Sequence, residues 1–143
     1  MLLHAHQFVV ALAHGGASIL GFASSSLRVH VGVRMAAMDA RILSILAIVT
    51  RELEKPQLVR HRAGQLRLSP SRFEHLFKKE TGQAFKAFVR ANRMTRAKDM
   101  LQDPTLRIKE VAASVGYSDV SNFAHDFRKQ YGQPASGSRS PSP

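Results

Sequence analysis

Serine, histidine and lysine side chains recur in the same order at two places in the chain. Shifting the sequence by 50 positions superimposes six identical residues: Ser71, Phe73, His75, Phe77, Lys79 and Gly82 coincide with Ser121, Phe123, His125, Phe127, Lys129 and Gly132. Serine and histidine exchange hydrogen bonds, and lysine carries a positive charge. The chain therefore contains one structural unit twice, and each copy carries hydrogen-bonding and cationic groups.

Basic residues strongly outnumber acidic ones. The chain has 21 Lys and Arg against 10 Asp and Glu, and residues 39–143 hold 19 of the bases and all 10 acids. The electrostatic field of this positive charge attracts polyanions. The composition therefore predicts nucleic acid as the first candidate partner and an anionic membrane as the second.

The residue types that catalytic and metal sites need are missing or scattered. The chain has no cysteine, which excludes disulfides, thiolate catalysis and cysteine zinc sites. It has no glycine-rich phosphate loop and no paired carboxylates in an expected cleft. His4 and His6 stand in an apolar leader and form no larger ligand cluster. We therefore expect a protein that is not an enzyme and needs neither a metal nor another cofactor.

Residues 1–38 are expected to be a poorly ordered leader or a misassigned start, with Met35 or Met38 as the alternative first residue. The stretch lacks a Lys- or Arg-rich beginning and is interrupted by His14, Gly15 and Gly16. These features argue against a secretory signal or a membrane span. We expect a cytoplasmic, nucleoid-associated protein without a membrane partner.

From Asp39 onward the apolar spacing is helical, and no segment alternates with period two for long. We expect six helices. The first starts at Asp39 and ends before Lys55-Pro56, the second covers about 57–66, and the third runs from Ser69-Pro70 to about Glu80. The fourth covers about 84–101, the fifth covers about 108–115, and the sixth runs from Ser118 or Asp119 to Tyr131. Their expected buried residues are Ile42, Leu43, Leu46, Val49 and Leu53; Leu58 or Val59, Ala63 and Leu66; Phe85, Phe88, Val89, Met94, Ala97 and Leu101; and Ile108, Val111, Ala112 and Val115. The composition of residues 135–143 predicts a disordered tail.

Each copy of the repeat is a short helix, a tight turn and a second helix. In the second copy Ala112 is small enough for two helices to cross closely, and Gly116 can adopt a positive φ at the turn. Phe123 and Phe127 lie one helical turn apart and are expected to hold the second helix on the core. The outer face of that helix is then free for a DNA groove. Two ordinary helical hairpins would explain the apolar positions but not the basic helix ends.

The chain resembles the DNA-binding domain of the AraC/XylS family of transcription regulators over about 39–134. The stretches SPSRFEHLFKKETG, RAKDML and IKEVAASVGYSDVSNF carry the resemblance. It implies an all-α fold with two homeodomain-like helix-turn-helix subdomains, at about 57–81 and 108–131, joined by a long linker helix at about 84–101. Because residues 1–38 are too short for a sensor domain, the chain is similar to stand-alone members or is a fragment.

The resemblance implies a sequence-specific regulator whose two recognition helices enter successive major grooves of double-stranded DNA. A linker helix of about 18 residues is about 27 Å long. With its flanking turns it can hold two recognition helices roughly 34 Å apart, which is one turn of DNA. We expect a monomer on an asymmetric site, with RNA polymerase as a candidate second partner. The alternative function is a non-specific RNA-binding or nucleoid-type protein, which would need exposed aromatic side chains for stacking.

Matching positions assign roles to individual residues. The resemblance implies that base edges are read by Ser71, Glu74 and His75 in the first unit and by Val120, Ser121, Asn122 and His125 in the second. A glutamate accepts a hydrogen bond from the cytosine amino group, a valine touches a thymine methyl, and a histidine donates to guanine. Glu74 has an alternative partner in Lys78, one turn on. Phosphate contacts are implied for Arg72, Lys78, Lys79, Arg128 and Lys129, with Arg90, Arg93 and Arg96 as further candidates.

Three departures from the family pattern affect these expectations. Arg62 stands where leucine is usual, which bears on the packing of the first scaffold helix. His125 stands where arginine is common, which bears on base preference. The sequence Gly132-Gln133-Pro134 brings proline one residue early, so we expect the last short helix to be shortened or absent.

Overall fold

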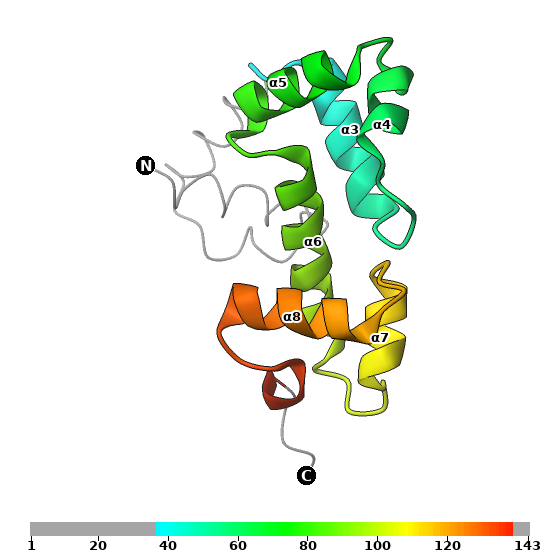
Figure 1. Cartoon of the computed structure of the whole chain (residues 1–143), viewed down its shortest axis with the longest axis vertical. Coiled ribbons are helices and arrows are strands. Elements are labelled where there is room, and N and C mark those ends of the chain that lie inside the picture. The colour runs from blue at the N-terminus through cyan, green and yellow to red at the C-terminus, as the bar shows by residue number, and fades with distance from the viewer. Residues whose placement is uncertain (1–36, 139–143) are drawn as a thin grey trace. The chain divides into compact units, whose positions relative to one another are not determined.

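The described residues, 37–138 in a computed structural model, form two compact units made of helices (Figure 1). The first unit contains the described residues up to Arg51 together with Gln57–Phe88, and the second contains Glu52–Pro56 and the residues from Val89 onward. No strand occurs in the range 37–138, in agreement with the predicted all-α fold. The predictions for residues 1–36 and 139–143 lie outside the described residues.

The first unit is built around a cluster of phenylalanine rings. It comprises α3 (Ala40–Arg51), α4 (Val59–Gln65), α5 (Pro70–Thr81) and the first turn of α6 (Phe85–Met100). The ring of Phe85 lies edge-on to those of Phe73 and Phe77, with centroid separations of 5.2 Å in both pairs. Phe88 packs against Phe77 at 5.4 Å. All four rings are buried, so α5 and α6 are joined through one apolar centre.

The inward stripe of α3 differs from the expected one by one residue. Ile45 is fully buried, whereas Leu43, which we expected inside, is only half-buried. Ile42, Ile45, Leu46 and Val49 follow the spacing of three, four and seven that defines one helical face, and Leu43 lies at its edge. The expected burial of α3 is otherwise confirmed.

Helix α4 is shorter than expected and buries a cation. Leu58 is 46% exposed, and Val59 and Leu66 are half-buried, so Ala63 is the one expected apolar residue of this segment that is buried. Arg62 is 3% exposed. Its guanidinium donates from Nε and Nη2 to Oε1 of Gln57, at 3.0 and 2.8 Å, and from Nη1 to Oε1 of Gln65 at 3.1 Å. Amide oxygens thus satisfy the buried arginine that stands where leucine is usual in the family.

The second unit has its own hydrophobic core. It comprises the rest of α6, α7 (Ile108–Ser114), α8 (Val120–Tyr131) and the 3-10 helix η1 (Ala135–Ser138). The core contains Met94, Ala97, Leu101, Val111, Ala112, Val115, Phe123, Phe127 and Ala135. Ile108, which we expected inside, is only partly buried. The expected inward residues of α6 are all buried.

Helix η1 corrects the expected start of the tail. We expected disorder from residue 135 onward, but Ala135 is 4% exposed and belongs to the second core. The amide of Gly137 donates to the carbonyl of Pro134 at 3.0 Å, which closes one short turn. The last helix is therefore shortened rather than absent, because a small apolar residue after the proline still completes the core.

The first unit begins before Asp39, which we expected to be its first residue. Met38 is 9% exposed, and the backbone amide of Asp39 donates to Oε2 of Glu80 on α5 at 3.0 Å. Hydrogen bonds from the Arg41 side chain and backbone lower the pKa of the Asp39 carboxyl to about 2. Residues 38 and 39 are thus part of the fold.

Candidate nucleic-acid interface

The two helix-turn-helix copies share the same turn. Leu68 and Tyr117 donate their amides to the carbonyls of Ala63 and Ala112, both at 3.0 Å. The residue before each takes a positive φ, which is 56° at Arg67 and 88° at Gly116. The turns therefore correspond at an offset of 49 residues, whereas the following helices correspond at 50. The second copy has one extra residue between its turn and its second helix.

Helices α5 and α8 begin and end in the same way. The Ser69 hydroxyl accepts from the amide of Arg72 at 3.3 Å, and the Asp119 carboxylate accepts from the amides of Ser121 and Asn122 at 2.6 and 3.2 Å. These side chains satisfy amides that have no partner inside the helix. Each helix ends at a left-handed glycine, Gly82 with φ 78° and Gly132 with φ 73°. Both predicted stops are confirmed.

The two helices turn the same positions outward. Phe73 and Phe77 on α5 and Phe123 and Phe127 on α8 are fully buried. Residues 71–80 and 121–130 have the same sequence of buried, half-buried and exposed positions throughout. We call the exposed residues of these stretches the outer faces: Ser71, Arg72, Glu74, His75, Lys78 and Lys79 on α5, and Ser121, Asn122, Ala124, His125, Arg128 and Lys129 on α8.

Apart from the further phosphate candidates on α6, every residue to which we assigned a base or phosphate contact lies on these outer faces, except Val120, which is the first residue of α8 and 43% exposed. None of their side chains makes a hydrogen bond or ion pair with another residue in the described part of the chain. The alternative pairing of Glu74 with Lys78 is not formed. The polar groups of both faces are therefore available to a ligand.

The three α6 arginines that we considered as phosphate candidates have different surroundings in the structure. Arg93, which we considered a phosphate candidate, donates from Nε to the carbonyl of Leu53 and from Nη2 to that of Lys55, both at 3.0 Å. Its guanidinium also lies 5.7 Å from the ring centroid of Tyr117, and burial lowers its pKa. Arg93 therefore holds the segment Glu52–Pro56 on the second unit. Arg96 is exposed.

A polar link that the sequence did not reveal joins α8 to its surroundings. The Tyr117 hydroxyl donates to Oδ2 of Asp126 at 2.7 Å, and Nη1 of Arg90 lies 3.6 Å from Oδ1 of the same carboxylate. Burial, and then the hydrogen bond and charge of Asp126, raise the pKa of Tyr117. Asp126 lies three residues after Phe123, on the inward stripe of an amphipathic helix. A polar residue at such a position is the sequence signal that could have indicated a buried polar partner.

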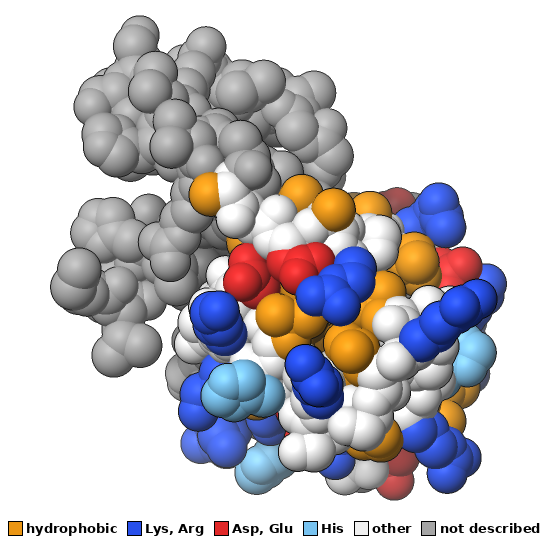
Figure 2. Space-filling view, turned by 90° about the horizontal axis from the view of Figure 1, so that it is seen from above, with side chains coloured by type: hydrophobic (Ala, Val, Ile, Leu, Met, Phe, Trp, Pro, Cys, Tyr) orange, Lys and Arg blue, Asp and Glu red, His pale blue; other side chains and the backbone are white. Residues whose placement is uncertain are grey.

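Figure 2 shows Lys, Arg and His side chains over the visible face of the molecule, with few acidic side chains among them. Within residues 37–138, no group of three or more His, Cys, Asp or Glu is placed to hold a metal ion. No helix in the same range is long and apolar enough to cross a membrane.

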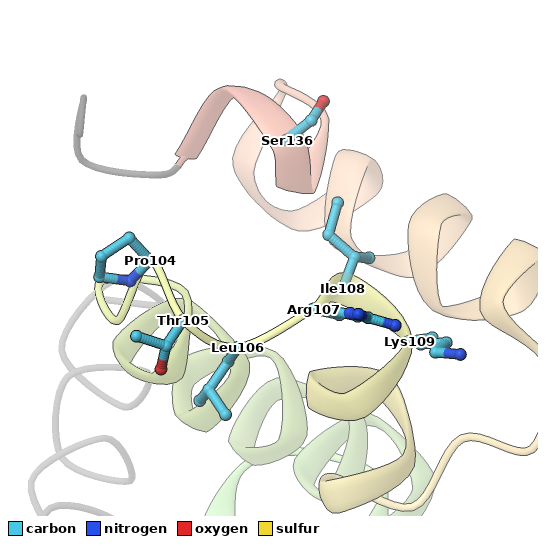
Figure 3. Close-up of a pocket in the computed structure, with 7 residues that line it drawn as sticks. All are labelled: Pro104, Thr105, Leu106, Arg107, Ile108, Lys109 and Ser136. Atoms are coloured by element: carbon cyan, nitrogen blue, oxygen red, sulfur yellow. The ribbon is translucent and has the colours of Figure 1, made fainter.

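A hollow of about 430 Å³ lies outside the outer faces (Figure 3). It is formed by residues 104–109, at the start of α7, and by Ser136 of η1. No carboxylate or imidazole lines it, and its charged lining residues are Arg107 and Lys109. None of the residues that we assigned to DNA contacts takes part in it.

Comparison with known proteins gives consistent matches. The family described as "Helix-turn-helix domain" matches residues 62–140, which is more than half of the chain. The HTH-type transcriptional regulator AlkR of Acinetobacter baylyi is 31% identical over 98 residues, which cover 68% of this chain and 32% of AlkR. The matched part of the chain spans between 12% and 37% of the length of such curated relatives.

Two solved structures share the fold. The C-terminal domain of AraT, a response regulator from Geobacillus stearothermophilus, has a TM-score of 0.68 and 22% identity, and the match covers 71% of this chain and 84% of that domain. The DNA-binding domain of the global transcriptional factor AdpA, solved in complex with a target DNA, has a TM-score of 0.66 and 21% identity, covering 69% of this chain and 89% of that one.

Proposed function

Because this chain belongs to the AraC/XylS family of helix-turn-helix transcription regulators, we propose that it regulates transcription by binding specific double-stranded DNA with α5 and α8. The observation that carries the proposal is the pair of matching outer faces, whose side chains are exposed while the phenylalanines beneath them are buried. The structure of the AdpA domain with its target DNA supports the same use of this fold.

Within this proposal, the N-terminal halves of α5 and α8 read bases, and most phosphate contacts come from their last turns. Base contacts come from Ser71, Glu74, His75, Val120, Ser121, Asn122 and His125. Lys78, Lys79, Arg128 and Lys129 lie at the C-terminal ends of the two helices, where long cationic side chains reach the DNA backbone, and Arg72 adds a phosphate contact. Two successive major grooves are the proposed binding site.

The cationic set is tested through the salt dependence of binding. Each phosphate contact that is lost should reduce the slope of log K against log salt by about 0.9. Replacing Lys79 or Lys129 by Gln should therefore flatten the slope, whereas Arg93→Gln should leave the slope unchanged because that guanidinium is bound to backbone carbonyls. Equal slopes for Lys79→Gln, Lys129→Gln and the parent protein would contradict the phosphate assignment.

The alternative of a non-specific RNA-binding or nucleoid-type protein is tested by competition. Phe73, Phe77, Phe123 and Phe127 are 0% exposed, so they are not available to stack on bases. A labelled specific duplex, selected from random DNA, should be displaced from the protein by the same duplex without label. An equal mass of single-stranded RNA should not displace it. Equal displacement by RNA would favour the alternative.

Further parts of the proposal concern the assembly. We propose that the chain acts as a binding protein without catalytic activity, on the chromosome in the cytoplasm, and that residues 37–138 are its DNA-binding part. It binds as a monomer to an asymmetric site, with RNA polymerase as a second partner. Sedimentation of the protein with a short specific duplex should give one chain per duplex, and two chains would contradict the monomer.

A further inference from the structure

The outer faces of α5 and α8 carry the same groups at most corresponding positions. Serine stands at 71 and 121, histidine at 75 and 125, and lysine at 79 and 129. Lys78 corresponds to Arg128, which keeps the charge. The two faces differ at Arg72, which corresponds to Asn122, and at Glu74, which corresponds to Ala124.

The shared residues also have the same orientation about their own helices. Both helices are fixed to their cores by phenylalanines at matching positions, 73 and 77 in one and 123 and 127 in the other. Both are capped at residues 69 and 119 and stopped at residues 82 and 132. A residue at position n of α5 therefore points away from its core in the same direction as the residue at position n + 50 points from the core of α8.

We infer that the DNA site consists of two half-sites that share the base pairs facing the serine and the histidine of each recognition helix, and that differ at the base pair facing residue 74 or 124. They also differ where Val120 and Asn122 read bases, because Pro70 and Arg72 stand at those positions of α5. Glu74 selects cytosine in the half-site of α5, and Ala124 leaves the corresponding position of the other half-site without that selection. This inference rests on the proposed function, because it assigns the DNA sequence that the two faces recognise.

Glu74 is the distinguishing residue because of its charge. It is the one carboxylate on either outer face, and it stands among Arg72, Lys78 and Lys79. Its oxygens accept no hydrogen bond from another residue in the described range. A carboxylate brought against DNA needs a donor, and the cytosine amino group is the base-edge group in the major groove that suits it. The methyl group of Ala124 neither donates nor accepts a hydrogen bond.

The experiment is selection of duplexes from random DNA by the full chain, followed by affinity measurements on the selected site. For the parent protein we expect two half-sites, compared in both orientations, that agree at the base pairs facing the shared serines and histidines. At the base pair facing residue 74 or 124, the half-site of α5 should have cytosine and the half-site of α8 should show no preference for cytosine. Glu74→Ala gives α5 the residue found on α8. It should abolish the cytosine preference in that half-site, a loss of about 5-fold to 150-fold in discrimination, without changing the other half-site.

Two further variants make the test specific. Ala124→Glu should introduce a cytosine at the corresponding position of the second half-site. Glu74→Gln should change the preference from cytosine to adenine, because an amide pairs with the N6 and N7 groups of adenine. Both substituted residues, Glu74 and Ala124, are exposed, and thermal melting should show that each of the three variants folds like the parent protein.

The possible outcomes separate the inference from the proposed function. Two half-sites that share no bases in either orientation would overturn the inference and leave sequence-specific binding intact. The same holds if Glu74→Ala changes neither half-site or changes both. If the parent protein enriches no sequence, both the proposed function and the inference are overturned.

Discussion

At the turn of each helix-turn-helix copy one residue takes a positive φ, and the two copies fill that position differently. Gly116 has no side chain, and a Cβ atom there would lie 2.6 Å from the carbonyl oxygen of Leu53 and 2.7 Å from the Arg93 guanidinium. Gly116→Ala is therefore expected to lower the free energy of unfolding by at least about 2 kcal/mol, from crowding and backbone strain together. Urea denaturation measures the loss.

Gly132→Ala separates the two causes. Gly132 also has a positive φ, but apart from its own atoms and those of its two chain neighbours, no heavy atom lies within 4 Å of the position that its Cβ would occupy. Its substitution should cost about 1 kcal/mol, from backbone strain alone. Arg67→Gly, at the equivalent turn, should be neutral or stabilising by up to about 1 kcal/mol, because the non-glycine residue there already bears that strain. Equal losses in Gly116→Ala and Gly132→Ala would contradict the close approach of Leu53.

Tyr117 makes the stability of the second unit sensitive to alkaline pH. Its pKa is raised in the folded state, by burial first and then by the hydrogen bond to Asp126. An unfolded tyrosine ionises near pH 10, so above that pH the unfolded chain releases a proton that the folded chain keeps. The contribution of Tyr117 is complete below about pH 10 and is lost as the pH rises further.

The measurement is the free energy of unfolding at pH 9 and pH 11 for the parent protein and for Tyr117→Phe. The variant should lose less stability over this range than the parent protein does. Tyr131→Phe should also lose less stability than the parent protein, because burial raises the pKa of Tyr131 as well. The double variant should be the least sensitive to pH. An unchanged pH dependence in Tyr117→Phe would show that this hydroxyl is not buried in solution.

At the scale of elements, the recognition helices depend on their buried phenylalanines. Phe127 is 0% exposed and packs against Phe123 at 5.8 Å and Tyr131 at 4.8 Å between ring centroids. Phe127→Ala should lower the free energy of unfolding by about 3–5 kcal/mol, because both apolar contact and a filled volume are lost. Phe77→Ala is the equivalent change in the first unit and should cost a similar amount. A loss below about 1 kcal/mol in Phe127→Ala would place this ring at the surface.

The positions of α5 and α8 followed from the sequence because local signals agreed at both ends of each helix. Ser69-Pro70 and Gly82 delimit α5 as predicted, and the repeat transferred the same interpretation to α8. Helix α4, the first scaffold helix, was less predictable. Its length was overestimated, since Leu58 and Leu66 resemble core residues in sequence while tertiary packing leaves one exposed and one half-buried.

At the scale of the whole molecule, the described fold begins at about residue 37. Removing residues 1–36 is expected to leave the melting temperature and DNA affinity nearly unchanged, because the repeat and the core residues described above lie within residues 38–138. Removing residues 1–39 also deletes the buried Met38 and the Asp39 amide that donates to Glu80. That shorter protein should lose about 1–3 kcal/mol of stability. A large loss on removing 1–36 alone would show that this segment completes a core.

The sequence alone determined the repeat, the helix-turn-helix units and the outward face of each recognition helix. These follow from local causes: apolar residues at helical spacing, capping side chains and stop glycines, all of which lie within a few residues of the structure that they define.

Tertiary structure decided which polar groups are used internally. The sequence presents Arg90, Arg93 and Arg96 as equivalent cations on one helix. The fold bonds Arg93 to the carbonyls of Leu53 and Lys55, some 40 residues away along the chain, and brings Arg90 to Asp126. A hydrogen bond depends on where its partner lies in space, and sequence spacing within one helix carries no information about a partner on another segment.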